Sequence, residues 1–544
     1  MDDKNNFIKG TLILAIANVI SKILGAVFKI PLTYILKEEG MAIFNTASTV
    51  YSLFLTVVIS GIPLATSRLV SSDTALNRHP DVIKTVSASR RLLCLIGGIL
   101  SIVLFFIATP IAIAMKDPAA AHAIRIISPS IFFVAWGNAY KSYFQGTSKM
   151  IPSALSQVLE SILRLAVGYL LALMFINSTT GVTAAAATSG ITAGEIFATL
   201  LLGGMYFFSS RKIKEKSTLG YKKIYSLILS VAIPMFICSL TLSMLNILDT
   251  ATVRNQLLRI RFTPDTAKAF LLKYSSYTSL FDNLLSELKL SAEGARWLYG
   301  AYSGYALTVF HLPIGMIATL SVSILPLIAG NIAKNNISGV RSSVNTAVNL
   351  TLFCAVPAVI ILFSSAEEIL KLLFNNTASA HMLQIVSPCL IFICLSQIFI
   401  SVFHAAGRIY EPFFIQLAGI FIKVSGNFVL IKIPGLNIDG AILSSTVAFF
   451  FITVASGILL SKTFGINYKL KYILPPFISA IPMYAVIRLI QSPMYCIFPN
   501  TIFAFLITVF TAAVSYILSM SLLSPAGLPI QFIKQKNRDN KFFS

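Results

Sequence analysis

Residues 91–115 read RLLCLIGGILSIVLFFIATPIAIAM, and this run decides the class of fold. After Arg91 it contains no charged side chain, and as a helix it would cross the roughly 30 Å of hydrocarbon in a bilayer. Its polar and apolar residues do not alternate, as they would in a strand of a membrane β-barrel. Because backbone groups in lipid need partners within the protein, the run predicts a membrane-spanning helix.

Similar runs fill the chain, and we expect about fourteen spanning helices in all. They lie near 10–36, 43–69, 91–115, 121–145, 151–176, 183–209, 224–249, 300–328, 343–363, 381–406, 412–432, 438–461, 472–491 and 498–523. The composition agrees, because 56% of the 544 residues are hydrophobic and 11% are charged. A water-soluble fold of this composition would expose too much apolar surface. The predicted fold class is an all-α membrane protein.

The net charge of +22 is distributed as a membrane topology predicts. Basic residues collect in alternate loops, for example from Lys462 onward after the twelfth span and in the tail at 524–544. The loops between these, on the opposite side of the membrane, carry few basic residues. The exception is the longer segment 250–299, which also contains acidic residues. Since basic loops stay inside, we expect a multi-pass protein of a bacterial plasma membrane with both termini cytoplasmic. Anionic membrane lipids are expected partners of these loops. No aromatic-basic module indicates nucleic-acid binding.

One motif occurs twice in the chain. Residues 126–133 read IISPSIFF and residues 385–392 read IVSPCLIF, six predicted spans apart. The openings of the first and seventh spans, at 11–17 and 226–232, also resemble each other. Shared apolar composition is one explanation, but two matches in the same order favour a duplicated six-helix unit. Parallel repeats of this kind place a transported substrate at the repeat interface near the bilayer midplane.

The repeat predicts the domain organisation. Two pseudo-symmetric six-helix lobes are followed by two additional helices and a basic cytoplasmic tail. Their predicted limits are 1–210 for the N-terminal lobe, 224–461 for the C-terminal lobe with its outer segment 250–299, 472–523 for the additional helices and 524–544 for the tail.

Basic and polar residues inside the predicted spans are the first candidates for a substrate site, because charges in hydrocarbon are costly and usually functional. Asn18, Lys22 and Lys29 share one face of the first span. Lys423 lies four positions before Asn427 and has no acidic neighbour in its own helix. It therefore needs water, another helix or a ligand. Such cations favour a cavity for an anionic substrate, with snorkelling or a structural role as the alternative.

Other ionisable or polar residues lie inside other predicted spans or at the ends of those spans. Asn246 and Asp249 end the seventh span and His311 lies in the eighth, and we include all three among the candidate substrate-binding residues. Glu160 and Arg164 are four positions apart on one helix and can neutralise each other. We interpret them as a structural pair.

Motifs for enzymatic chemistry are missing from the sequence. There is no nucleotide-binding P-loop, no nucleophile elbow and no metal-ligand spacing. We therefore expect no cofactor and no metal site. An ion gradient or the membrane potential is the expected source of energy, and the sequence does not identify the coupling ion.

The stretch ISGIPLATSRLV at 59–70 resembles the second span of the stage V sporulation protein B group of polysaccharide transporters. Four shorter matches occur in the family's order, and the resemblance covers roughly residues 10–520. They are ISKILG at 20–25, YFQG at 143–146, SQVLE at 156–160 and LPIG at 312–315. The group belongs to the multidrug/oligosaccharidyl-lipid/polysaccharide exporter superfamily.

The resemblance implies fourteen helices, in two six-helix lobes plus two more. It also implies flipping of an undecaprenyl-pyrophosphate-linked saccharide, such as lipid II, from the inner to the outer leaflet. Peptidoglycan flippases of the superfamily carry basic residues of the first helix in a central cavity, and Lys22 and Lys29 match that character. Lysine stands where arginine is common and lacks its bidentate fork. Proteins of cell-wall assembly are candidate partners.

Two other functions compete with flipping. A cation-coupled multidrug exporter would favour acidic cavity residues, and the chain has few candidates: Glu160, Glu195 and Asp249. A membrane saccharide polymerase or ligase would need catalytic groups concentrated in a large outer loop, and segment 250–299 offers only scattered ones. We therefore expect a transporter and not an enzyme.

Overall fold

The computed structural model describes residues 2–76, 78–147, 149–210, 220–274, 281, 284–315, 317, 328, 331–332, 336–408, 410–467, 470–497 and 501–523. Within these ranges the chain is almost entirely helical and contains no strand. In the described part, ten helices are long and apolar enough to cross a membrane, or eleven with one bent pair. The prediction of an all-α membrane protein is confirmed, while the count of fourteen spans stays a prediction.

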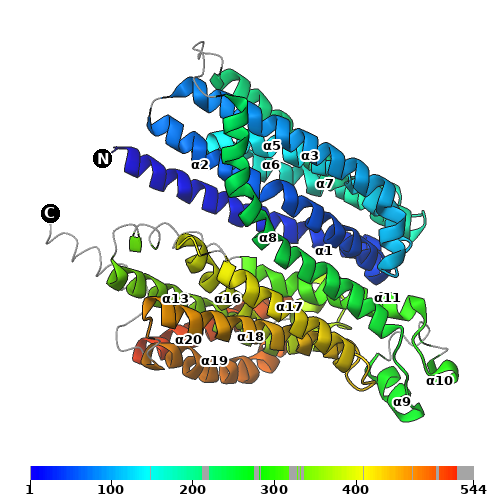
Figure 1. The fold of residues 1–544 in the computed structure, drawn as a ribbon. Coiled ribbons are helices and arrows are strands. Elements are labelled where there is room, and N and C mark those ends of the chain that lie inside the picture. The colour runs from blue at the N-terminus through cyan, green and yellow to red at the C-terminus, as the bar shows by residue number, and fades with distance from the viewer. Residues whose placement is uncertain are drawn as a thin grey trace. The chain divides into compact units, whose positions relative to one another are not determined.

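The helices form two compact units, Met1–Gly304 with Val424–Gly440, and Tyr305–Lys423 with Ala441–Ser544. The first unit contains α1 (Asp2–Ile59), α2 (Gly61–Ala75), α3 (His79–Ala114), α4 (Ala120–Ile127), α5 (Ser130–Gly146), α6 (Met150–Met174), α7 (Thr180–Ser210), α8 (Tyr221–Leu257), α9 (Pro264–Lys273), α10 (Leu284–Glu287) and α11 (Ala292–Gly300). In Figure 1 these run from blue to green.

The second unit follows a short π-helix, Ala301–Ala306, and contains most of the remaining helices. They are α13 (Ile337–Ser364), α14 (Ala366–Phe374), α15 (Ala380–Val386), α16 (Cys389–Ala405), α19 (Leu470–Ile497) and α20 (Thr501–Leu523), with parts of α17 (Tyr410–Leu430) and α18 (Ile438–Phe464). The predicted lobe boundary between 210 and 224 differs from this grouping because α8 packs against α1 and α2. The lobes as bounded in the sequence remain a prediction.

Helix breaks fall at the Ser-Pro step of the repeated motif, inside two segments, 121–145 and 381–406, that were each predicted as one span. α4 ends before Ser128-Pro129 and α5 begins after it, while α15 and α16 flank Ser387-Pro388 with a bend of 44°. Proline has no N–H to donate and its ring clashes with the preceding turn. In each break the serine hydroxyl instead donates to a backbone carbonyl three residues earlier, at 2.8 Å.

The packing around the motif is also repeated inside each unit. Thr199 on α7 donates to the carbonyl of Phe133 at 2.7 Å, and Thr453 on α18 donates to that of Phe392 at 2.7 Å. Phe133 and Phe392 hold the same position in the motif. A Cβ at Gly203 would lie 3.3 Å from the Tyr140 ring, and one at Gly457 would lie 3.3 Å from the Phe399 ring. Equivalent helices therefore pack alike, as a duplicated unit requires.

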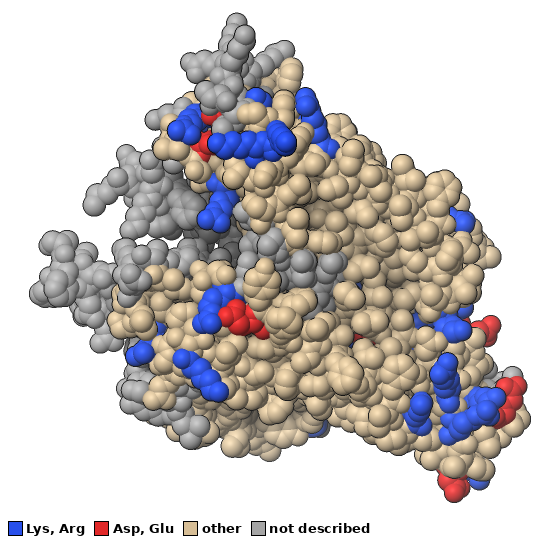
Figure 2. All heavy atoms as spheres, in the orientation of Figure 1, with Lys and Arg blue, Asp and Glu red and all other residues tan. Residues whose placement is uncertain are grey.

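Charged side chains on the face in Figure 2 lie near the ends of the helices, and uncharged residues cover the helix surfaces between them. Many of these surface residues are large and apolar, such as Phe106, Leu170 and Phe421, which are exposed by 74%, 59% and 74%. A continuous apolar surface of this kind suits lipid and not water. The surface therefore agrees with a membrane-spanning bundle.

The outer segment has a small core of its own, built from aromatic rings. Phe270 contacts Phe262, Tyr274 and Phe281, with ring centroids 4.8–5.4 Å apart. Trp297 on α11 packs against Tyr274 and Phe281. Burial raises the pKa of the Tyr274 phenol, so its hydroxyl stays protonated even at alkaline pH. The segment between α8 and the π-helix is thus folded, at least over its described residues.

Three ion pairs, at two carboxylates, attach this segment to the rest of the first unit. Arg254 donates to Asp117 at 2.5 Å, and Arg296 lies 3.6 Å from the other oxygen of the same carboxylate. Asp117 is completely buried between α3 and α4. Lys273, at the end of α9, donates to Asp439 at 2.8 Å. Breaking a buried pair leaves an uncompensated charge, so the attachment at the fully buried Asp117 is the costlier one to break.

Candidate functional site

The predicted substrate-binding residues are found in several places. The side chains of Asn18 and Lys22 lie outside the described residues. Lys29 is partly buried on α1, and it has no hydrogen bond or ion pair to another described residue. Lys423 is buried on α17, with 6% of its surface exposed. His311 is exposed in the second unit, beside the ring of Phe310.

The structure brings together Asp249 and Asn427, which are 178 positions apart. The Asn427 amide donates to Asp249 Oδ1 at 2.9 Å and to Thr252 Oγ1 at 3.0 Å. Asn427 is fully buried, and its own oxygen has no hydrogen-bond partner among the described residues. Asn246 lies three positions before Asp249 and is exposed. The contact gathers carboxylate, amide and hydroxyl groups where α8 meets α17, within the first unit.

A second polar cluster lies within the first unit and has three members. Arg164 forms an ion pair with Glu160 on the same helix, as the spacing predicts. Glu195 on α7 approaches the same guanidinium, with 3.8 Å between Arg164 Nη2 and Glu195 Oε1. The sequence identified the pair but did not place Glu195 beside it, because Glu195 belongs to another helix. The cluster has two carboxylates for one arginine.

Glycines explain why α6 and α7 come close enough to form this cluster. Gly190 and Gly194 are four positions apart on α7, the small-residue spacing that lets membrane helices approach closely. A Cβ at Gly190 would lie 2.5 Å from the Arg164 carbonyl oxygen, and one at Gly194 would lie 2.7 Å from that of Glu160. Larger residues would push the helices apart and remove Glu195 from the arginine.

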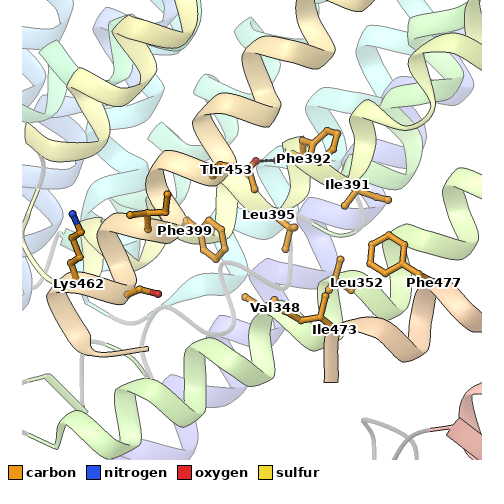
Figure 3. Close-up of a pocket in the computed structure, with 14 residues that line it drawn as sticks. Val348, Leu352, Ile391, Phe392, Leu395, Phe399, Thr453, Lys462, Ile473 and Phe477 are labelled. Atoms are coloured by element: carbon orange, nitrogen blue, oxygen red, sulfur yellow. Dashed lines mark hydrogen bonds between the residues drawn. The ribbon is translucent and has the colours of Figure 1, made fainter. Parts of the chain in front are cut away.

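The second unit contains an apolar groove of about 570 Å³ (Figure 3). Its walls come from α13, α16, α18 and α19, and its polar residues are Thr453, Ser461 and Lys462. The lining is Val348, Leu352, Ile391, Phe392, Leu395, Phe399, Thr453, Val454, Gly457, Ile458, Ser461, Lys462, Ile473 and Phe477. Thr453 already donates to a backbone carbonyl, so it offers no free proton to a ligand. Lys462 lies at one end of the groove in Figure 3.

Side-chain size distinguishes this groove from the corresponding face of the first unit. By the register of the repeated motif, Ile391 and Leu395 correspond to Phe132 and Trp136. Those two rings lie 6.0 Å apart on α5 and are larger than the aliphatic pair. α19, one of the two helices that follow the repeat, supplies a wall through Ile473 and Phe477. The sequence placed Lys462 in a basic loop but did not predict the groove, since it depends on packing between helices.

Comparison with known protein families assigns the chain. A model described as polysaccharide biosynthesis protein matches residues 7–286, and a model described as lipid II flippase MurJ matches residues 278–474. The chain belongs to the polysaccharide biosynthesis protein family. The resemblance to the stage V sporulation protein B group is confirmed as well.

Two relatives from Bacillus subtilis (strain 168) illustrate the family. Stage V sporulation protein B is 25% identical over 478 residues, which cover 86% of this chain and 86% of the relative. Lipid II flippase MurJ is 22% identical over 499 residues, which cover 86% of this chain and 84% of the relative. Both matches run over most of each chain, so the family relationship is not limited to one lobe.

Solved structures show the same fold. Lipid II flippase MurJ in an inward closed conformation has a TM-score of 0.68 at 17% identity, covering 94% of this chain and 98% of that one. An inward-facing multidrug resistance MATE transporter has a TM-score of 0.61 at 12% identity, covering 83% and 98%. This family member is therefore a multi-pass membrane transporter and not an enzyme, as expected from its sequence.

Proposed function

We propose that the protein flips an undecaprenyl-pyrophosphate-linked saccharide from the inner to the outer leaflet by alternating access. The substrate is lipid II or a polysaccharide precursor, used for cell-wall, spore-cortex or polysaccharide assembly. The observation that carries this proposal is the apolar groove of the second unit with a lysine at one end. The relatives named stage V sporulation protein B and lipid II flippase MurJ support it.

The groove matches the two chemical parts of such a lipid. A polyprenyl chain is stabilised by about 0.8 kcal/mol for each CH₂ group that it buries, and the groove walls are almost wholly apolar. Lys462 lies in the last turn of α18, at the helix end that the positive-inside rule places in the cytoplasm. It would thus lie at the leaflet from which the diphosphate starts, and a lysine near that surface contributes about 1 kcal/mol toward an anionic headgroup.

Cations within the spans support the passage of the headgroup. A diphosphate crossing the low-dielectric interior is strongly penalised unless positive charge accompanies it. We propose that Lys22 and Lys29 on α1 and Lys423 on α17 provide this charge. Asn18, Asn246, Asp249, Asn427 and His311 complete the proposed set of polar contacts.

Reconstitution in liposomes tests the proposal. Purified protein should move labelled lipid II to the outer leaflet, where an impermeant reagent modifies it, and should not export cationic dyes. Depletion in cells should reduce lipid II accessibility on the outer face. The alternative function is a multidrug exporter. Two observations support it, namely the two carboxylates around Arg164 and the fold shared with a MATE transporter. Dye export without lipid movement would replace our proposal with that alternative.

Filling the groove should weaken binding of the lipid tail. Leu395→Trp introduces the residue that the first unit carries at the matching position. If the larger ring keeps two CH₂ groups of the lipid tail out of the groove, the binding free energy falls by about 1.6 kcal/mol. This corresponds to roughly a tenfold loss of affinity. The measurement is the Kd of a polyprenyl diphosphate for the purified protein. Val447→Trp on α18 is the matched control, because Val447 is 53% exposed and does not line the groove. Equal affinity of both variants would contradict the groove assignment.

Reporter fusions test the proposed orientation. A fusion at Lys534 and one within 210–223 should be cytoplasmic, because both lie in strongly basic segments. A fusion within 265–290 should be external. Paired phosphatase and fluorescent reporters distinguish the two sides. An external fusion at Lys534 would place the C-terminus outside the cell. It would rule out the arrangement in which an even number of spans leaves both termini in the cytoplasm.

A further inference from the structure

The cluster of Glu160, Arg164 and Glu195 has an unbalanced charge. If all three groups ionise, two negative charges face one positive charge inside a bundle of membrane helices. Among the described residues, Arg164 is the only cation within ion-pair distance of either carboxylate. An unpaired carboxylate at such a position is costly. One negative charge therefore needs a further partner.

The geometry of the two carboxyl groups identifies this partner. Glu160 Oε1 and Glu195 Oε1 both approach the same nitrogen, Arg164 Nη2, so the two carboxyl groups lie beside each other. Two carboxyl groups at one site repel when both are ionised, and one proton held between them removes that repulsion. With that proton in place, the remaining negative charge is balanced by Arg164 and the cluster is neutral.

Tyr51 on α1 adds an independent observation. Its side chain is 6% exposed, and its hydroxyl has no hydrogen-bond partner among the described residues. Its helix α1 packs against both α6 and α7, and Glu195, Arg164 and Glu160 on those helices are the charged groups that act electrostatically on its hydroxyl. A phenol can donate to a carboxylate, and a buried hydroxyl without a partner costs about 1–3 kcal/mol. Tyr51 is thus placed to donate to the cluster when a carboxylate becomes free.

We propose that Glu160 and Glu195 hold one exchangeable proton beside Arg164, forming a proton-binding site in the first unit. Release of the proton leaves a second carboxylate, and the Tyr51 hydroxyl donates to it. The exchange changes a contact between α1, which also carries Lys29, and the α6–α7 pair. Proton occupancy thereby biases the arrangement of the first unit and supplies the ion coupling that the transporter needs. The proton is bound whether or not a lipid is present.

Infrared spectroscopy of the purified full chain tests the site without any lipid substrate. The wild-type protein should show the C=O stretch of a protonated carboxylic acid at neutral pH, and this band should disappear at high pH. Glu195→Gln should remove the band, because the one remaining carboxylate pairs with Arg164. Glu160→Gln should do the same for the same reason. Glu293→Gln, which changes an exposed carboxylate on α11, is the matched control and should leave the band unchanged.

Tyr51→Phe gives a readout that a purely structural role would not produce. The band should remain, but the pH at which it disappears should rise, because the carboxylate loses its donor. Thermal unfolding of each variant shows whether it is folded. If Glu160→Gln does not fold, the two other single variants, Glu195→Gln and Tyr51→Phe, decide the question. Absence of the band in wild type, or its survival in Glu195→Gln, would overturn the proposal. Removal of the band by Na⁺ at constant pH would assign the site to sodium instead.

Discussion

Changing Lys29 to glutamine should reduce the flipping of a lipid-linked saccharide diphosphate by about tenfold or more. A lysine within a span costs roughly 2.5–3.5 kcal/mol at the bilayer centre, so its retention implies a compensating role. Loss of only 1.4 kcal/mol of interaction with the diphosphate already corresponds to a tenfold change. Lys29→Arg should retain part of the activity because the positive charge is kept. Lys22→Gln should behave like Lys29→Gln.

The control for this experiment lies on the same helix. Lys37→Gln makes the same chemical change at an exposed position, where α1 kinks with a φ of 52°. It should flip at the wild-type rate. Initial rates in liposomes are compared at equal amounts of inserted protein. Full activity of both Lys22→Gln and Lys29→Gln would show that the substrate is not held by these cations, and a neutral or cationic substrate would then be favoured.

Asp117→Asn should lower the free energy of unfolding by about 3–5 kcal/mol, the usual cost of removing one partner from a buried ion pair. Asp117 is fully buried, and its loss leaves the charge of Arg254 without compensation in the first unit. Arg254→Met in the same background should recover part of the loss, since it removes the stranded charge. Thermal or denaturant unfolding in detergent provides the measurement.

Asp265→Asn supplies the comparison for this prediction. Asp265 lies on α9 in the same outer segment, and it is exposed. Neutralising it should change the unfolding free energy by less than about 0.5 kcal/mol, as for most surface substitutions. If Asp117→Asn were equally mild, the Asp117 ion pairs would not hold the outer segment in place, and the aromatic core around Phe270 and the Lys273–Asp439 pair would have to do so.

Local rules accounted for the helices and their breaks. The apolar run at 91–115 forms the second half of α3, which ends at Ala114, and the Ser-Pro steps at 128–129 and 387–388 lie where helices are interrupted. The ion pair between Glu160 and Arg164 also follows from spacing alone, since residues four apart share a face of a helix. These features depend on neighbours along the chain, so the sequence contains the information directly.

Contacts between helices required the structure. Nothing in the sequence placed Asn427 against Asp249, because the two residues lie on different helices and the crossing point of those helices is not encoded in the spacing of either. For the same reason Arg254 was not linked to Asp117. The groove at Leu395 depends on the sizes of side chains from four helices. The sequence of any one helix does not predict the space that is left between the four.

The sequence predicted a helical membrane protein and favoured an internal repeat. Hydrophobicity and charge decide which segments enter lipid, and a repeated motif shows through its order along the chain. The position of Glu195 beside Glu160 and Arg164 came from the folded structure alone. That depends on Gly190 and Gly194 letting two backbones approach, a distance that is set when helices pack and not by any one helix.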